Sequence, residues 1–300
     1  MKTIRKTAAF AIVVAVTAIS SLAIYWLPAT QPHFQDVAYA KNSSRNTLDV
    51  YLSDTTDEPQ PLVILVHGGG FRSGDKARPG HLDDFLAAGF AVAAINYRLS
   101  GEATWPAQLT DVTHAVRFLH DNATHFGIDP DRIAIFGQSA GGHLTATSTF
   151  DLASQGVNIL RAAIIWFGPV DFSTMDDDMA ASGQGSSDTD GPGSPESGLI
   201  GAPVGENPEL ARSASPLTFL EALPDDARLP RILIMHGAKD PLIAARQSER
   251  LHDAIATHQA NGGIRLLILT EGTHGGGEFN KPATIQAVIA FLDDEMGPDL

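Results

Sequence analysis

The chain has 300 residues, of which 43% are hydrophobic and 18% charged, and its formal net charge is −15 at pH 7. This composition supplies enough apolar material for one or two globular domains and excludes a chain that is disordered throughout. The acidic charge disfavours binding to nucleic acid, and the absence of cysteine excludes disulfides, thiolate metal sites and a cysteine nucleophile.

The N-terminus carries the features of an export signal. Three basic residues among the first six precede an almost uncharged apolar run over residues 7–27. This arrangement is typical of a signal peptide or a signal anchor, and about 20 apolar residues in a helix can cross a bilayer core. Because the basic residues lie only before the run, the positive-inside rule predicts export. The product would be periplasmic, extracellular, or tethered to the membrane and facing outward.

We divide the chain into a signal peptide or anchor (1–27), a polar connector (28–36) and one folded domain (37–300). Within the domain, apolar segments alternate with amphipathic helical patterns, two of which run over 244–258 and 282–292. Several apolar segments are continuous, which is typical of strands covered on both faces. The alternation predicts a mostly parallel twisted sheet with helices on both faces. Its strands are expected at residues 48–52, 62–66, 90–95, 133–136, 162–167, 232–235 and 264–269.

One stretch, residues 176–197, departs from this alternation. It is rich in Asp, Ser, Gly and Pro. These residues favour turns and irregular backbone, so we expect a flexible insertion within the domain. The aspartates at 176–178 lack the glycine and glutamate of a calcium-binding loop, and the histidines lack paired ligand spacing, so no metal site is predicted.

The expected strand 133–136 leads into the pentapeptide Gly137-Gln138-Ser139-Ala140-Gly141, after which an apolar helix begins. A G-x-S-x-G sequence between a strand and a helix is typical of a nucleophile elbow. The tight turn exposes the serine hydroxyl and aims the amide of the following residue, Ala140, at a developing oxyanion. The alternative is a glycine-rich turn without chemistry, and the pentapeptide alone does not separate the two.

A second glycine-rich motif, His67-Gly68-Gly69-Gly70, ends the expected strand 62–66. Glycines allow the backbone to approach a ligand closely, and acyl transfer needs inward-pointing amides to stabilise an oxyanion. This position, one strand–helix unit before the elbow, is that of the oxyanion loop in lipases and esterases. No Gly-Lys-Ser/Thr follows, which excludes a phosphate-binding loop.

A serine nucleophile needs a base and an acid that orients the base. In a fold with this elbow, the acid and then the histidine follow the serine in the chain, each just after a strand. Asp240 and His274 occupy these positions. Asp171 is the main rival for the acid, whereas His143 and His236 are interpreted as structural. The predicted catalytic triad is therefore Ser139, Asp240 and His274.

Taken together, these motifs resemble the HGGG-bearing esterases of the α/β-hydrolase superfamily, above all the feruloyl and acetyl-xylan esterase-like group. The resemblance extends from about residue 37 to the C-terminus. It implies an α/β-hydrolase fold and hydrolysis of small or short-acyl carboxylic esters without a cofactor. It also implies an oxyanion hole formed by amides near Gly69, Gly70 and Ala140. The matching stretches are Leu48–Tyr51, His67–Lys76, Asn96–Ser100, Trp105–Ala107, Gly127–Pro130, Ser139–His143, Ser194–Ser197 and His236–Pro241.

Three other functions are compatible with this fold. A prolyl-oligopeptidase-type peptidase shares the triad order, but the chain has no room for its propeller domain. An arylformamidase-like amidase is closer in size and is the main alternative. A binding protein without catalytic activity would not need an intact triad. The sequence names neither the natural ester nor the oligomeric state.

Overall fold

The structure, a computed structural model, describes residues 30–56, 58–258 and 263–297. The predicted signal peptide or anchor lies outside these residues, so the fold below is that of the unit Pro32–Leu300. Within the described ranges, no helix has both the length and the apolar character needed to cross a bilayer.

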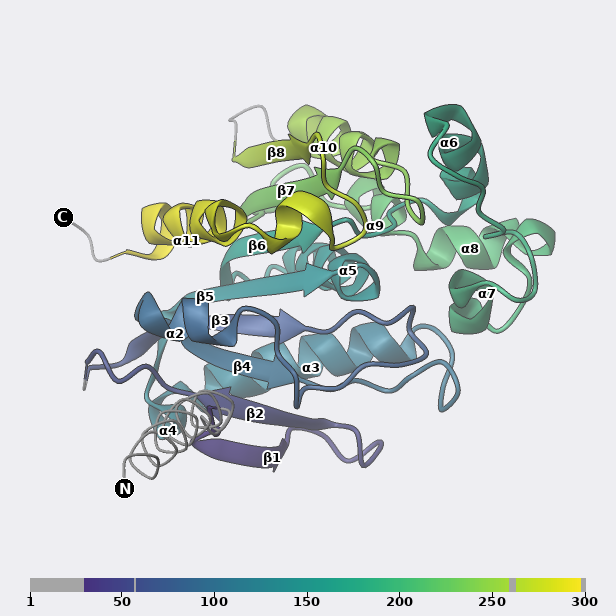
Figure 1. The fold of residues 1–300 in the computed structure, drawn as a ribbon. Helices are drawn as coiled ribbons and strands as arrows, with labels where there is room; N and C mark the ends of the chain where they lie inside the picture. Colours follow the sequence, from purple (N-terminus) through teal and green to yellow (C-terminus); the bar gives the residue numbers. More distant parts are fainter. Residues whose placement is uncertain (1–29, 57, 259–262, 298–300) are drawn as a thin grey trace, which may run out of the picture. The chain divides into compact units, whose positions relative to one another are not determined.

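An eight-stranded sheet runs through the domain in the order β1-β2-β4-β3-β5-β6-β7-β8 (Figure 1). Strands β3 to β8 are parallel to one another, whereas β2 pairs antiparallel with β4, and β1 pairs antiparallel with β2. The predicted mostly parallel sheet is thereby confirmed. The strands are β1 Phe34–Ala38, β2 Thr47–Tyr51, β3 Gln60–Val66, β4 Ala91–Ile95, β5 Ile128–Gln138, β6 Leu160–Trp166, β7 Arg231–Gly237 and β8 Ile264–Leu269.

Helices cover both faces of the sheet (Figure 1). Helices α3, α5 and α10 pack against one face, and α2 and α11 pack against the other. The remaining helices, α4 and α6 to α9, lie in the connections. The bounds are α2 Leu82–Ala87, α3 Ala107–Asp121, α4 Ala123–Phe126, α5 Ala140–Ser154, α6 Met175–Ser182, α7 Pro195–Ile200, α8 Pro208–Ala214, α9 Pro216–Glu221, α10 Arg246–His258 and α11 Pro282–Met296.

Strand β3 shows why the central strands are continuously apolar. Leu62 and Ile64 belong to the core on one face of the sheet, and Val63 and Leu65 belong to the core on the other. Successive strand residues point to opposite faces, so a strand with helices on both sides needs an apolar residue at every position. Burying each such aliphatic side chain contributes about 1.5–3 kcal/mol.

The first strand differs from the sequence-based division. Residues 34–36, assigned there to the connector, belong to β1. This strand lies at the edge of the sheet, and none of its side chains is fully buried. Edge strands do not need the continuous apolar run by which the others were recognised. Strand β1 therefore has no continuous apolar run from which it could be predicted.

The segment 176–197, expected to be a flexible insertion, contains regular structure at both ends, where α6 and the start of α7 lie. Asp178 on α6 accepts hydrogen bonds from Arg250 Nε and Nη2 at 2.9 and 2.7 Å and from Gln247 Nε2 at 2.7 Å. Asp176 accepts hydrogen bonds from Ser187 Oγ at 2.5 Å and from the Thr189 amide at 2.8 Å. Asp178 thus attaches this segment to α10, whereas Asp176 holds two parts of the segment together.

Candidate active site

Ser139 lies in a sharp turn between β5 and α5. Its backbone has a φ of 55° and a ψ of −123°, a conformation that is disfavoured for residues with a Cβ atom. A Cβ on Gly137 would overlap the carbonyl oxygen of Gly141, and a Cβ on Gly141 would overlap that of Val66. Close packing thus requires glycine on both sides of the serine, and the turn has the geometry of a nucleophile elbow.

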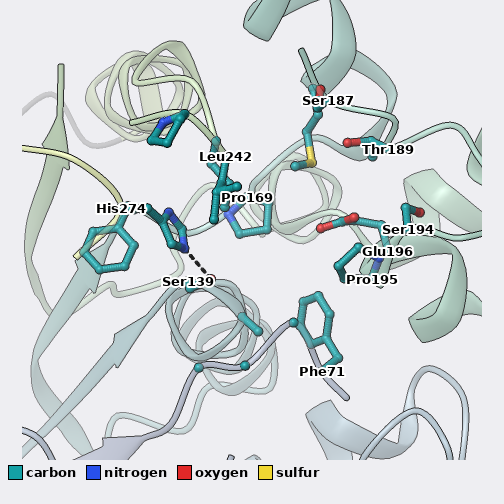
Figure 2. A pocket seen from close by; sticks show the side chains of 18 of the residues that line it. Phe71, Ser139, Pro169, Ser187, Thr189, Ser194, Pro195, Glu196, Leu242 and His274 are labelled. Carbon is teal, nitrogen blue, oxygen red and sulfur yellow. Dashed lines mark hydrogen bonds between the residues drawn. The ribbon is translucent and has the colours of Figure 1, made fainter. Parts of the chain in front are cut away.

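The side chains of Ser139, His274 and Asp240 form one continuous hydrogen-bonded chain. His274 follows β8, and its Nε2 lies 2.9 Å from Ser139 Oγ, a hydrogen bond drawn as a dashed line in Figure 2. Its Nδ1 lies 2.8 Å from Asp240 Oδ2. Asp240 lies in the turn after β7. Because β5, β7 and β8 are parallel, their carboxyl ends share one edge of the sheet, where such folds place their sites. The structure therefore brings together the three residues that the sequence predicts as a triad.

Asp240 is held as a buried carboxylate. It is 1% exposed, and its Oδ1 accepts hydrogen bonds from the amides of Leu242 at 2.8 Å and Ile243 at 3.0 Å. Burial alone would raise the pKa of this carboxyl, but the imidazoles of His236 and His274 and the Ile243 amide hold the pKa well below its usual range. A charged Asp240 accepts the Nδ1 proton of His274, which leaves Nε2 free to accept a proton from the serine.

His236, interpreted from the sequence as structural, also contacts the acid. Its Nε2 lies 3.5 Å from Asp240 Oδ2 and 2.9 Å from the Ile243 carbonyl oxygen, and its Nδ1 lies 2.6 Å from Ser248 Oγ. His236 thus holds Asp240 and the following turn together. The spacing of four residues between His236 and Asp240 was a visible signal, but their contact depends on how the chain turns after β7.

The rival acid, Asp171, has a different role. Its side chain accepts hydrogen bonds from the Ser173 amide at 3.2 Å and from Ser173 Oγ at 2.6 Å. It thereby caps the short 3-10 helix Phe172–Thr174. The carboxylate bonded to His274 belongs to Asp240, so the structure favours Asp240 over Asp171 as the orienting acid.

The loop after β3 supplies backbone amides beside the serine. The Gly69 carbonyl oxygen accepts hydrogen bonds from the amides of Arg72 and Ser73, both at 3.1 Å. Across a trans peptide the next N–H points the opposite way, so the Gly70 amide is directed away from that turn. Within the described residues, the amides of Gly69, Gly70 and Ala140 donate to no protein acceptor. All three residues line the same cavity as Ser139, where their amides are available for an oxyanion.

This cavity has a volume of about 750 Å³, and its floor contains Ser139 and His274 (Figure 2). Phe71, Pro169 and Leu242 contribute apolar surface to its wall. Another part of the wall is polar and comes from the segment between α6 and α7, including Ser187, Thr189 and Ser194, and from Glu196 in the first turn of α7. The predicted insertion is thus part of the site. In the described part of the chain, no group of three or more His, Asp or Glu side chains could hold a metal ion.

His143 supports the elbow helix from beneath the site. It lies on α5, one turn after Ser139, and its Nε2 donates to the Ala214 carbonyl oxygen at 2.7 Å. Its ring stacks on Phe172 with the centroids 5.2 Å apart. Burial lowers the pKa of His143 to about 4, although the bond to Ala214 opposes this shift. The structural interpretation of His143 therefore agrees with its contacts.

The buried His143 predicts a pH-dependent stability. Its pKa is about 4 in the fold, against an ordinary value of 6.5, so between these pH values the unfolded chain takes up a proton that the folded chain does not. Stability should therefore fall as the pH drops, by about 2 kcal/mol between pH 7.5 and pH 5 for this group. Denaturant unfolding at both pH values should show a smaller fall for His143→Gln than for the exposed control His114→Gln. An equal fall in the two variants would contradict this assignment.

The sheet order, the elbow after β5 and the Ser–His–Asp chain at the carboxyl edge define the domain as an α/β-hydrolase. Residues 48–255 match the family model BD-FAE. The chain belongs to this family, and the predicted resemblance to α/β-hydrolase esterases is confirmed.

Known proteins similar to the chain carry esterase names. It is 28% identical over 244 residues to the "Probable carboxylic ester hydrolase LipM" of Mycobacterium tuberculosis, covering 74% of this chain and 52% of LipM. It therefore spans about half the length of that relative. Among solved structures, it resembles a "Bifunctional GH43-CE" of Bacteroides eggerthii, with 28% identity and a TM-score of 0.74. The match covers 88% of this chain and 38% of that protein. It also resembles a "Truncated form of carbohydrate esterase from gut microbiota", with 29% identity and a TM-score of 0.71. That match covers 88% of this chain and 95% of the other.

Proposed function

We propose that the protein is a serine esterase that hydrolyses small or short-acyl carboxylic esters through an acyl-enzyme on Ser139. The observation that supports this most directly is the hydrogen-bonded chain from Ser139 through His274 to Asp240. It faces a cavity that is also lined by three residues whose amides are free to bind an oxyanion. The esterase names of the relatives agree with this proposal.

The arrangement supplies each step of ester hydrolysis. Ser139 Oγ attacks the ester carbonyl carbon while His274 Nε2 takes up the hydroxyl proton, and Asp240 stabilises the resulting imidazolium. The amides of Gly69, Gly70 and Ala140 bind the oxyanion. The alcohol then leaves with the proton from His274. Water deprotonated by His274 attacks the acyl-enzyme, which releases the carboxylic acid and restores the Ser139 hydroxyl.

An ester panel tests this proposal. Purified protein lacking residues 1–30 should hydrolyse p-nitrophenyl acetate and butyrate with a higher kcat/KM than the laurate and palmitate esters. The polar wall between α6 and α7 offers little apolar surface to a long acyl chain. Sugar acetates belong in the panel because one similar structure is described as a carbohydrate esterase. N-formylanilines test the amidase alternative. A clear optimum at long acyl chains, or at the formamides, would contradict the proposal.

We also propose that the domain is exported and that its N-terminal segment can tether it to a membrane. The support is the basic start and the apolar run over residues 7–27. Fractionation of the full-length tagged chain in a bacterial host should recover it in the membrane or exported fractions. Recovery wholly in the cytosol would contradict export.

A further inference from the structure

The polar wall of the cavity contains a buried carboxyl group that the esterase mechanism does not use. Glu196 lies in the first turn of α7 and is 6% exposed. Figure 2 shows its carboxyl group pointing into the cavity, across from Ser139 and His274. Carboxyl groups are rarely buried unless they are paired. We therefore expect the Glu196 carboxyl group to have a hydrogen-bonding or charged partner.

The described part of the chain supplies no such partner. No side chain there donates a hydrogen bond to the Glu196 carboxyl, which contacts its own backbone amide. The nearby Arg72 donates instead to the carbonyl oxygens of Gly193, at 2.8 Å, and Ser194. Burial raises the pKa of Glu196 to about 7, although its own amide and Arg72 oppose the shift. The hydrogen-bonding capacity of Glu196 therefore remains open toward the cavity.

Two neighbouring hydroxyls on the same wall are already engaged. Ser187 Oγ donates to Asp176 at 2.5 Å, and Ser194 Oγ accepts the Ser197 amide at 2.9 Å. These bonds hold the wall in place, whereas the Glu196 carboxyl group is available to form a hydrogen bond with a ligand in the cavity.

The position of Glu196 is fixed relative to the oxyanion loop. The bonds from Arg72, which follows that loop, hold residues 193 and 194 immediately before α7. A Cβ on Gly70 would lie 3.2 Å from the Cβ of Pro195, so the loop and the start of α7 are in contact. A substrate whose carbonyl lies at the oxyanion amides would therefore present a defined part of its structure to Glu196.

The charges around Glu196 restrict what it can bind. An anion would be repelled by the carboxylate, and an ammonium group placed beside it would also meet the guanidinium of Arg72. A hydroxyl group avoids both conflicts, because it can donate to the carboxylate or accept from the protonated acid. The cavity thus offers a hydrogen-bonding position for an uncharged polar group within a partly apolar site.

We propose that Glu196 is a specificity-determining residue that binds a hydroxyl group of the ester substrate. This inference rests on the proposed esterase function and extends it to a substrate class, esters with a hydroxyl group beyond the reacting carbonyl. An unpaired Glu196 is costly when the cavity holds a substrate without that hydroxyl, so the residue selects against such esters.

Matched substrate pairs test the proposal. The first pair is 1-acetylglycerol and propyl acetate, which differ in hydroxyls on the alcohol. The second is methyl 4-hydroxycinnamate and methyl cinnamate, which differ in a hydroxyl on the acyl group. The wild type should prefer the hydroxylated member of at least one pair by about tenfold or more in kcat/KM. Glu196→Leu should reduce this ratio to about one, mainly through KM.

Two variants separate binding from a structural effect. Glu196→Gln keeps a hydrogen-bonding group of similar shape and should retain part of the preference, whereas the exposed control on α8, Glu209→Leu, should retain all of it. Thermal unfolding establishes that each variant is folded. A ratio unchanged in Glu196→Leu, or an equal loss for both members of each pair, would overturn the proposal.

A binding measurement keeps this test independent of catalysis. Calorimetry with Ser139→Ala should show tighter binding of the hydroxylated ester than of its partner in at least one pair. In Ser139→Ala/Glu196→Leu that difference should disappear. If wild-type protein hydrolyses no ester, the esterase proposal fails, and this comparison alone decides the role of Glu196. Equal Kd ratios in the two backgrounds would overturn it.

Discussion

Replacing Ser139 with alanine should lower kcat for p-nitrophenyl acetate by about 10⁴-fold or more, because the variant has no group to form the acyl-enzyme. Alanine keeps the Cβ atom and therefore keeps the strained backbone of the elbow, with its φ of 55°. The thermal unfolding temperature should consequently stay close to that of the wild type.

Two further serine variants provide the controls. Ser154→Ala, at the exposed end of the same helix, removes a hydroxyl that donates only to the Asp151 carbonyl oxygen, and it should leave kcat unchanged. Ser139→Gly should be as inactive as Ser139→Ala but more stable by about 1 kcal/mol, because glycine adopts a positive φ without strain. Near-wild-type turnover in Ser139→Ala would contradict the assignment of the nucleophile.

Asp240→Asn should lower kcat by about 10⁴-fold, because asparagine stabilises the tautomer of His274 that cannot accept the serine proton. The amides of Leu242 and Ile243 both donate to Oδ1, so the asparagine oxygen is required at that position. Its NH₂ group must then face His274 Nδ1, which becomes the acceptor. The His274 proton moves to Nε2, where it blocks the transfer of a proton from Ser139.

The same substitution should affect stability in a defined direction. Because the folded state lowers the pKa of Asp240, its carboxylate contributes stability that is present above the ordinary pKa and is lost as the pH falls through the folded value. Asp240→Asn removes this contribution and should lower the unfolding temperature at pH 7. Asp171→Asn, which changes the rival acid, should keep most of the activity. Comparable losses of kcat in the two variants would contradict the choice of Asp240.

Much of this fold follows from the sequence for a simple physical reason. Strands buried on both faces must be continuously apolar, so β2 to β7 were visible as apolar runs. Strand β8 was also visible as an apolar run, although it is an edge strand whose residues are partly exposed. The triad was predictable because its members follow strands in a fixed order. Edge strand β1 has no such run, and none of its side chains is fully buried.

Features that depend on distant contacts were not predictable. Helix α6 looks like a polar loop in sequence, and its attachment depends on Arg250, which is 72 residues from Asp178. The stretch 194–197 belongs to the expected insertion and to the family resemblance, and neither points to a buried carboxyl group. The burial of Glu196 depends on how α7 packs against the loop after β3, which local sequence does not specify. Likewise, only the turn after β7 places His236 against Asp240.

Covalent labelling tests directly whether Ser139 is an activated nucleophile at the floor of the cavity. Folded protein treated with a fluorophosphonate should gain the mass of one phosphonyl group. Peptide mass spectrometry should place that group on Ser139, and Ser139→Ala should gain none. Labelling at another serine, or no labelling of folded wild-type protein, would contradict the assignment of Ser139 as the nucleophile.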